Sequence, residues 1–413
     1  MSAAHDDLSK DPGGESSDRP GGGVVAPARQ HDEPAITAAP GDDDRAPPTT
    51  STGRGRGWWL ITGTLVALVV LCLVAAGRGQ LSIPPGEVAG SILHRLDTGL
   101  EGLLGAVGLT IDLPLDRVNV PAHPQGDAAL WQVRFPRIVL AVLVGAALAA
   151  AGALMQSMFG NPLAEPAIIG VSPGAAVGAS LAIVTGVDVL STWVVPLAAF
   201  AAALCTTLLV YALSRSGGRT ESITLILTGV AVTAIASAVV AFNTFIASPT
   251  AREQIVFWQL GSLNGARWQA VAVVVPFVVV GLVVAVALAR RLDLLALGDR
   301  SARHLGVNVE QLRVVAIVVI AMLVGAGVAF AGVIAFVGLV IPHLVRLVAG
   351  PGHRLLLPAS ALGGALLLTL ADLVARTAIP FADLPLGMLT AIVGGPFFLW
   401  LMRRMRSKQG GWA

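Results

Sequence analysis

Side chains that do chemistry are scarce in this sequence, and its positive charge is nearly all arginine. The chain has 413 residues, of which 55% are hydrophobic and 13% are charged, and its lysines are Lys10 and Lys408. Neither lysine belongs to a GxxxxGK[ST] loop, the motif that holds nucleotide phosphates in ATPases. Cys72 and Cys205 lie inside apolar runs, and no group of His and Cys has the spacing of a zinc site. We therefore expect no catalytic residue, metal site or cofactor, and no enzymatic activity.

The positions of the arginines are more informative than their number. The net charge of +2 is too small for a general attraction to nucleic acid, so no nucleic acid partner is expected. Arg134 and Arg137 flank Pro136 at the start of a long apolar run, and Arg376 lies at the end of another. Charges at such places need a lipid phosphate or an acidic partner.

The apolar runs predict an all-α polytopic membrane protein with about ten transmembrane helices. A helix needs about 20 residues to cross a hydrocarbon core of about 30 Å, and runs of that length recur from Trp58 onward. Residues 313–349 are too long for one crossing, so we divide them near Ala331 and Gly332. The third span is interrupted by Gly and Pro. The predicted spans are 58–76, 136–158, 168–187, 189–213, 222–247, 269–289, 313–331, 332–349, 355–376 and 385–402.

Arginine in the short loops predicts the orientation. Arg54 and Arg56 precede the first span and "RRMRSK" follows the last, so both termini are expected in the cytoplasm of a bacterial cell, with the chain multi-pass in the cytoplasmic (inner) membrane. Ten spans also place three basic loops inside, at 214–219, 290–313 and 350–354. Arg134, Arg137 and Arg376 are the exception, because they fall outside.

Composition divides the chain into three parts. Residues 1–57 are rich in Gly, Pro, Asp, Ser and Thr without apolar periodicity, which is typical of a disordered tail, here a cytoplasmic one. Residues 58–403 form the ten-span membrane domain. Within it, residues 77–130 form an external loop with a short helix beginning at the pair Pro84-Pro85. Residues 404–413 form a cytoplasmic C-terminal tail.

The cytoplasmic loop 290–313 has the clearest local pattern. Asp299 is suited to cap a short helix, and Gly306 stands where that helix would end in a left-handed residue. Gly298 separates this helix from an earlier helical turn, Asp293–Leu297. The two short helices either connect spans while lipid headgroups hold them, or form a knob for a cytoplasmic partner.

A few polar side chains lie within or beside the spans. One face of span 222–247 either lines a pathway or bonds back to its own helix; it comprises Thr224, Thr228, Thr233, Ser237, Asn243 and Thr244. Asn161 and Glu165 are expected to satisfy backbone groups freed where prolines end span two. Asp372 and Arg376 lie four residues apart on one helix face and are expected to pair. His343 is expected to be a hydrogen-bonded histidine beside Pro342.

The order of several motifs identifies a resemblance to the FecCD family of ABC-importer permeases, the type II importers for iron–siderophores, haem and cobalamin. It covers about residues 58–403. The matching stretches are "RFPR", "GALMQSMFGNPLAEPAIIGVSPGA", "LTGVAV", "FWQLGSL", "GVIAFVGLVIPHLVR", "HRLLLPASALGGALLLTLADLVAR" and "LPLGMLTAIVGGPFF". The loop 290–313 resembles the coupling helices of this family.

The resemblance implies the partners. Two permease subunits, as a homo- or heterodimer, line one pathway; a dimer of cytoplasmic ABC ATPases docks beneath; and an extracytoplasmic substrate-binding protein docks outside. The pathway is expected to be driven by the separate ATPase, and the lipid bilayer surrounds the permease. Spans 2–5 and 7–10 enter from opposite faces, which suits an inverted repeat.

The resemblance also implies site residues. Arg134, Arg137 and Arg376 correspond to arginines that meet acidic residues of the binding protein. The cytoplasmic gate maps to Glu221, Ser222 and Ile223, with Thr228 further along the pathway. The ATPase-coupling residues are Leu297, Gly298, Asp299, Arg300, Ala302, Arg303, Leu305 and Gly306. Ferric siderophore is the preferred cargo, with haem and cobalamin as alternatives.

Two other classes of function are weighed against this one. An ion-coupled secondary transporter needs ionisable residues near the middle of the bilayer. Asp372, His343 and Arg346 are the candidates, and all lie towards span ends. A membrane-embedded enzyme needs a nucleophile with its base or a metal cluster, and the sequence contains neither pattern.

Overall fold

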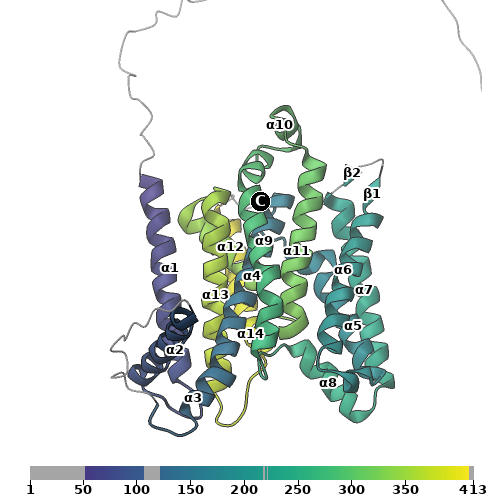
Figure 1. Cartoon of the computed structure of the whole chain (residues 1–413). Coiled ribbons are helices and arrows are strands. Elements are labelled where there is room, and N and C mark those ends of the chain that lie inside the picture. Colours follow the sequence, from purple (N-terminus) through teal and green to yellow (C-terminus); the bar gives the residue numbers. More distant parts are fainter. Residues whose placement is uncertain (1–51, 107–120, 217–218, 221, 409–413) are drawn as a thin grey trace, which may run out of the picture. The chain divides into compact units, whose positions relative to one another are not determined.

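The computed structural model describes residues 52–106, 121–216, 219–220 and 222–408, and regular structure in this part is almost entirely helical (Figure 1). The helices up to the middle of the chain are α1 (Thr52–Gly77), α2 (Pro85–Ala106), α3 (Gly126–Ala128), α4 (Phe135–Phe159), α5 (Val171–Val184), α6 (Val194–Leu213) and α7 (Ser222–Ile246). The later helices are α8 (Pro249–Leu260), α9 (Trp268–Leu295), α10 (Asp299–His304), α11 (Val309–Ala331), α12 (Val337–Ala349), α13 (His353–Thr377) and α14 (Leu386–Lys408).

Short irregular elements link several of these helices. A π-helical segment joins α3 to α4, and single 3₁₀ turns precede α5 and α6; they span Ala129–Arg134, Pro166–Ile169 and Val187–Leu190. Strands β1 (Arg215–Ser216) and β2 (Arg219–Thr220) form a two-residue antiparallel hairpin between α6 and α7.

The predicted all-α polytopic class is confirmed. Within the described residues, eight helices are long and apolar enough to cross a membrane: α1, the continuous run through α4, and α6, α7, α9, α11, α13 and α14. The predicted third and eighth spans coincide with the shorter helices α5 and α12, of 14 and 13 residues. At 1.5 Å per residue each rises only about 20 Å, less than a full crossing. The prediction of ten crossings therefore requires irregular backbone to complete these two.

Two irregular segments, 160–170 and 332–336, supply that backbone and are held by side chains. The predicted division near Ala331 is confirmed, because α11 ends there and Gly332 has φ 68°. Glu165 Oε1 accepts from the Phe336 amide at 3.3 Å, and Asn161 Oδ1 accepts from the Leu163 amide at 2.9 Å. The expected role of Asn161 is therefore confirmed, whereas Glu165 satisfies a backbone amide of the distant segment 332–336 and not one freed at the end of span two. Such bonds are needed because buried backbone within a membrane has no water to bind.

Helix α4 is the centre of the packing, with contacts to α13, α11, α9 and α12. Nearly all of its residues are buried. Close approach depends on glycine: a methyl group on Gly145 would overlap the Gly364 carbonyl, and one on Gly152 would overlap the Gly338 carbonyl. Small residues at helix contacts are the usual means of packing in membranes, where lipid competes equally for apolar surface.

The helices run between two ends of the bundle, which we name the α10 end and the α8 end (Figure 1). Helix α1 starts at the α10 end, and its last turn reaches the α8 end, where Arg134 binds its Ala76 carbonyl. Helix α14 returns to the α10 end. The first and last described helices thus have their outer ends at the same end of the bundle.

Several predicted boundaries differ from the structure. Helix α1 begins at Thr52, inside the expected tail 1–57, whose residues 1–51 lie outside the described part. Helix α2 begins at the expected proline pair but has 22 residues, and residues 107–120 of that loop are outside the described part. Helix α14 continues to Lys408, into the expected C-terminal tail, and residues 409–413 are not described.

Two short helices were predicted in loop 290–313, and the prediction is wrong for the first of them. Helix α9 continues without a break to Leu295, so Asp293 belongs to a long helix. Apolar residues at Leu292 and Leu295 stay buried on the same face of α9, which extends the helix past the expected end. Only α10 stands as a separate short helix, and Gly306 after it has the predicted left-handed conformation, φ 83°.

Candidate translocation cavity, coupling loop and charged network

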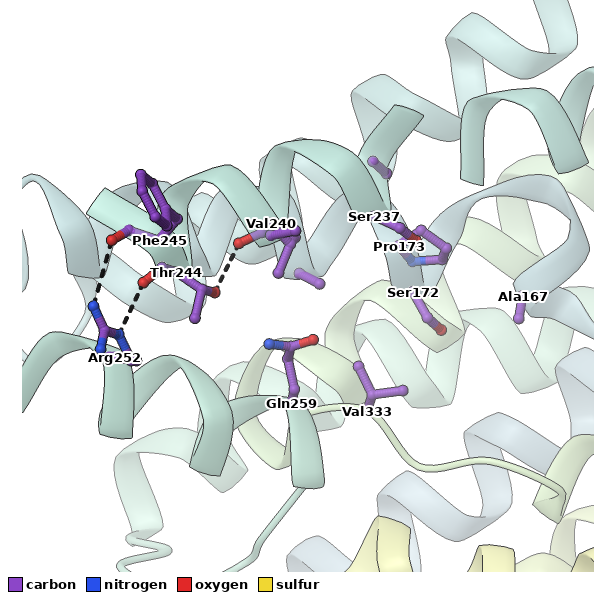
Figure 2. A pocket seen from close by; sticks show the side chains of 13 residues that line it. Ala167, Ser172, Pro173, Ser237, Val240, Thr244, Phe245, Arg252, Gln259 and Val333 are labelled. Carbon is purple, nitrogen blue, oxygen red and sulfur yellow. Dashed lines mark hydrogen bonds between the residues drawn. The ribbon is translucent and has the colours of Figure 1, made fainter. Parts of the chain in front are cut away.

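A cavity of about 790 Å³ lies between α5, α7 and α8 (Figure 2). Most of its walls are small or apolar side chains. It is lined by Ala167, Ser172, Pro173, Ala176, Ala236, Ser237, Val240, Ala241, Thr244, Phe245, Arg252, Gln259 and Val333. A wall of this composition offers hydroxyl and amide groups without a cluster of fixed charge, so it suits passage rather than tight binding.

The polar side chains predicted on one face of α7 differ in what they contact. Ser237 and Thr244 line the cavity, while Thr244 Oγ1 also donates to the Val240 carbonyl at 2.7 Å, the bond to its own helix that was the alternative. Asn243 is buried and donates through Nδ2 to Ser180 Oγ on α5 at 3.0 Å. Thr244 therefore fits both interpretations, Ser237 lines the cavity, and Asn243 binds a neighbouring helix instead.

Arg252 supplies the one charged side chain among the residues that line this cavity. It lies on α8, which starts after Ser248, whose Oγ accepts from the Ala251 amide at 3.3 Å. Its Nε donates to the Thr244 carbonyl at 3.1 Å and its Nη2 to the Phe245 carbonyl at 3.4 Å (Figure 2). The same Nη2 also donates to the Ala247 carbonyl at 3.3 Å. These bonds hold the guanidinium at the carbonyl end of α7, where the helix dipole favours a positive charge. Sequence reasoning missed this residue, although Ser248 followed by Pro249 is a signal for the start of a helix.

The predicted gate residues do not all fall on described structure. Glu221 lies outside the described residues, as does the side chain of Ser222, the first residue of α7. Ile223 is 74% exposed, and Thr228 is half-buried and does not line the cavity. The outer face of α7 also exposes Leu227 and Phe242. In this single chain, α7 therefore presents an apolar face suited to lipid or to another subunit.

The predicted coupling residues form a small protrusion around α10. Leu297 and Leu305 expose 63% and 57% of their surface, and Arg300 and Arg303 are exposed between them. Ala302 is fully buried, so it anchors the turn and is not part of its surface. Gly298 has φ 97° and, like Gly306, has open space where a side chain would be. Asp299 pairs with Arg313 on α11 at 3.1 Å, which ties the protrusion to the bundle.

The three arginines predicted to dock a binding protein come together at the α8 end of the bundle. Arg137 binds Asp372 Oδ1 through Nε at 2.7 Å and Asp383 Oδ2 through Nη1 at 2.9 Å. Arg376 lies 3.6 Å from the other oxygen of Asp372, so the predicted pair four residues apart is confirmed. Asp383 was not predicted; it lies in the turn between α13 and α14.

Two arginines of this network, Arg134 and Arg376, also bind the end of α1. Arg134 donates to the Ala76 carbonyl at 2.5 Å and to the Leu81 carbonyl, while Arg376 donates to the Arg78 carbonyl at 2.8 Å and to the Ala75 carbonyl. A docking role requires exposed side chains, whereas Arg134 and Arg137 are buried and the Arg376 side chain is only 8% exposed. The orphan carbonyls at the end of α1 explain the burial, since a helix end without partners needs donors.

His343 differs from its prediction. The residue is buried in α12 beside Pro342, but neither ring nitrogen has a hydrogen-bond partner in the described part of the chain. The expected hydrogen-bonded role is therefore wrong for the described residues. Asp372, a second of the three candidates for ion coupling, is held by two arginines.

A bundle of membrane-length helices with a wide, weakly polar cavity is the architecture of a permease, which moves a solute without altering it. The chain belongs to the FecCD transport family, whose sequence pattern matches residues 67–404.

The relatives of the chain are permeases of import systems. The hemin transport system permease protein HmuU of Yersinia pestis is 41% identical over 290 residues, covering 68% of this chain and 86% of that protein. The cobalamin import system permease protein BtuC of Halobacterium salinarum is 39% identical over 369 residues, covering 86% and 97%. A solved structure described as an inward-facing metal-chelate type ABC transporter has 31% identity and a TM-score of 0.70, covering 83% and 98%. This chain is a multi-pass membrane permease of an ABC importer, a system whose ATPase is a separate subunit.

Proposed function

We propose that this chain and a second permease subunit form the pathway through which an ABC importer carries a ferric siderophore inward. The observation that carries the proposal is the cavity between α5, α7 and α8. Its volume of about 790 Å³ is in the range of sites for whole organic ligands. Its lining contains no carboxylate, thiol or imidazole, so a bare metal ion would find no preferred ligands there. The exposed apolar face of α7 supports pairing with a second subunit, which completes the pathway.

Haem and cobalamin are the second candidate cargoes, favoured by the names of the two relatives. The charge on Arg252 separates the candidates, because carboxylates of a siderophore or the propionates of haem bind a guanidinium, whereas cobalamin carries no free carboxylate. An ion-coupled secondary transporter is not favoured, since the ionisable Asp372 is already paired with two arginines.

Replacing Arg252 with Gln is expected to slow uptake of the anionic chelate several-fold while leaving the folded amount unchanged, because a charged hydrogen bond contributes about 1.5–3 kcal/mol. The measurement is uptake of a ferric carboxylate siderophore, haem and cobalamin by cells that carry the importer. Glu253→Gln is the matched control, since Glu253 is the exposed neighbour and does not line the cavity. The siderophore assignment would be contradicted if the cells took up cobalamin but not the other two compounds, and if Arg252→Gln left the uptake of cobalamin unchanged.

We further propose that the α10 end faces the cytoplasm and that the protrusion around α10 binds the ATPase. Exposed Leu297 and Leu305 with exposed Arg300 and Arg303 support this role, since apolar centres with arginine are typical of interfaces. The α8 end then faces the binding protein. The docking role of Arg134, Arg137 and Arg376 stays a prediction.

The double variant Leu297→Ser/Leu305→Ser is expected to weaken association with the ATPase by about tenfold or more, because each buried interface leucine contributes roughly 1.5–3 kcal/mol. The measurement is co-purification and titration of the ATPase against the detergent-solubilised permease. Folding is expected to stay normal, since both side chains are exposed in this chain. Leu190→Ser is the control, because Leu190 is 80% exposed in the turn Val187–Leu190, which contacts α5 and α6 and is remote in sequence from α10. Equal ATPase affinity in all three proteins would exclude the proposed contact.

A further inference from the structure

One imidazole joins three helices near the α10 end. His353, the first residue of α13, lies with Nδ1 2.6 Å from Asp293 Oδ1 on α9 and with Nε2 2.6 Å from Ser157 Oγ on α4. The His353 backbone amide also donates to Asp293 Oδ1, at 2.9 Å. The ring is buried, with 5% of the residue exposed. Both ring nitrogens are therefore used, and each reaches a different helix.

The three side chains have the order of a catalytic Ser–His–Asp group, but their surroundings fit another role. Ser157 is buried within α4, and its hydroxyl also lies 2.6 Å from the Ala153 carbonyl of the same helix. A nucleophile must instead reach a substrate carbonyl next to donors for the developing oxyanion. The group is thus a link between helices.

The link lies directly between the coupling loop and the centre of the bundle. Asp293 is six positions before Asp299, on the last turns of α9 that lead into α10. A cavity of about 620 Å³ is lined by Asp293, His353 and Ser157 together with Gly298 and Asp299 of the loop.

The residue before Ser157 extends the link to a fourth helix. Gln156 donates through Nε2 to the Leu339 carbonyl at 3.0 Å, and its Oε1 accepts from Arg346 Nη1 at 3.1 Å, both on α12. Two consecutive residues of α4 therefore bind α12 on one side and α9 with α13 on the other. Helices joined in this way move together when one of them is displaced.

We propose that His353 is a positioning residue for ATP coupling: by binding Asp293 and Ser157 at once, it passes displacement of the α10 loop to α4 and α13. The proposal rests on the proposed contact of α10 with the ATPase. When His353 is removed, the loop still binds the ATPase, but α9 slides against α4 and the cavity between α5, α7 and α8 is not opened in step with hydrolysis.

The test uses the whole importer, permease with its ATPase and binding protein, in proteoliposomes, and measures ATP hydrolysed and chelate taken up. His353→Ala is expected to leave assembly and basal hydrolysis near the wild-type level while the amount taken up per ATP falls about tenfold, a typical size for coupling between sites. Ser360→Ala is the matched control, because Ser360 is buried on the same helix and its hydroxyl has no partner in the described chain.

Two conservative variants separate coupling from simple stability. His353→Asn places an amide nitrogen near the position of Nδ1 and keeps the side-chain bond to α9, whereas His353→Gln places one near Nε2 and keeps the side-chain bond to α4. The backbone amide of residue 353 still binds Asp293 in both variants. Each is expected to restore the folded amount fully and uptake per ATP only in part, since one of the two side-chain bonds is left. Asp293→Asn keeps an acceptor for the backbone amide of His353. This variant is also expected to lower uptake per ATP.

The outcomes distinguish this proposal from the proposed function. Absence of ATP-driven uptake by the unmodified complex would overturn the proposed function itself. Uptake per ATP in His353→Ala equal to that of the unmodified complex would overturn the coupling role alone. A proportional fall of hydrolysis, uptake and folded amount in the Ala, Asn and Gln variants would also overturn it, because His353 would then be structural only.

Discussion

Replacing Gly152 with alanine is expected to leave little folded permease. A methyl group at this position overlaps the backbone carbonyl of Gly338, and Gly338 in turn lies against the Leu148 carbonyl. Backbone on both sides prevents the relief that a flexible side chain would allow. Overpacking in cores costs about 1–3 kcal/mol and occasionally more, and we expect at least about 3 kcal/mol here because α4 and α12 must separate. The measurement is unfolding of the purified permease in detergent, with the monodisperse fraction after extraction.

The control for this variant is Gly63→Ala on α1. Gly63 is also within a membrane-length helix, but a methyl group there meets nothing within 4 Å. Alanine favours helix over glycine by about 1 kcal/mol, so stability is expected to be unchanged or slightly higher. A Gly152→Ala protein as stable as the Gly63→Ala protein would show that α4 and α12 are less closely packed than described.

Removing the charge of Arg137 is expected to destabilise the α8 end strongly. Asp372 is 1% exposed and would keep only Arg376, at 3.6 Å. Breaking a buried ion pair on one side costs about 3–5 kcal/mol, because a charge is left without its partner. Arg137→Met is therefore expected to lower the free energy of unfolding by about that amount, as measured in detergent.

A second substitution separates loss of the pair from loss of packing. Arg137→Met/Asp372→Leu is expected to recover part of the lost stability, because the buried Asp372 charge is removed together with its partner, while Arg376 and Asp383 each lose one ion-pair contact. Arg95→Met is the exposed control: Arg95 and Asp127 lie 3.7 Å apart with about half of each side chain exposed, so its effect should stay within about 1 kcal/mol. Arg137→Met without loss of stability would contradict a structural role for the network.

The same residues test docking to the binding protein. The docking prediction expects Arg134→Glu, Arg137→Glu and Arg376→Glu each to slow association and to change its salt dependence. Because these side chains are buried, the folded amount must be measured first, and Arg376→Gln gives the milder variant. If folded Arg376→Gln associates with the binding protein at the wild-type rate and with the wild-type salt dependence, then Arg376 has a structural role only.

Much of the fold follows from local features of the sequence. Apolar runs of membrane length predict α1, α4, α6, α7, α9, α11, α13 and α14, because each helix satisfies its own backbone wherever it lies. Gly332 and Gly306 mark helix ends, since their left-handed conformation is a property of single residues. The motif order, covering most of the chain, was sufficient for the family.

Contacts between distant residues depended on the tertiary structure. Arg137 is 235 positions from Asp372, and His353 is 60 positions from Asp293 and 196 from Ser157. Nothing in the spacing of these residues indicates the pairing, because helix packing brings them together. The same reason explains why the sequence did not reveal the burial of the arginines at the α8 end. Charge type and apolar runs can be read along the chain, whereas burial and partners depend on which helices lie alongside one another.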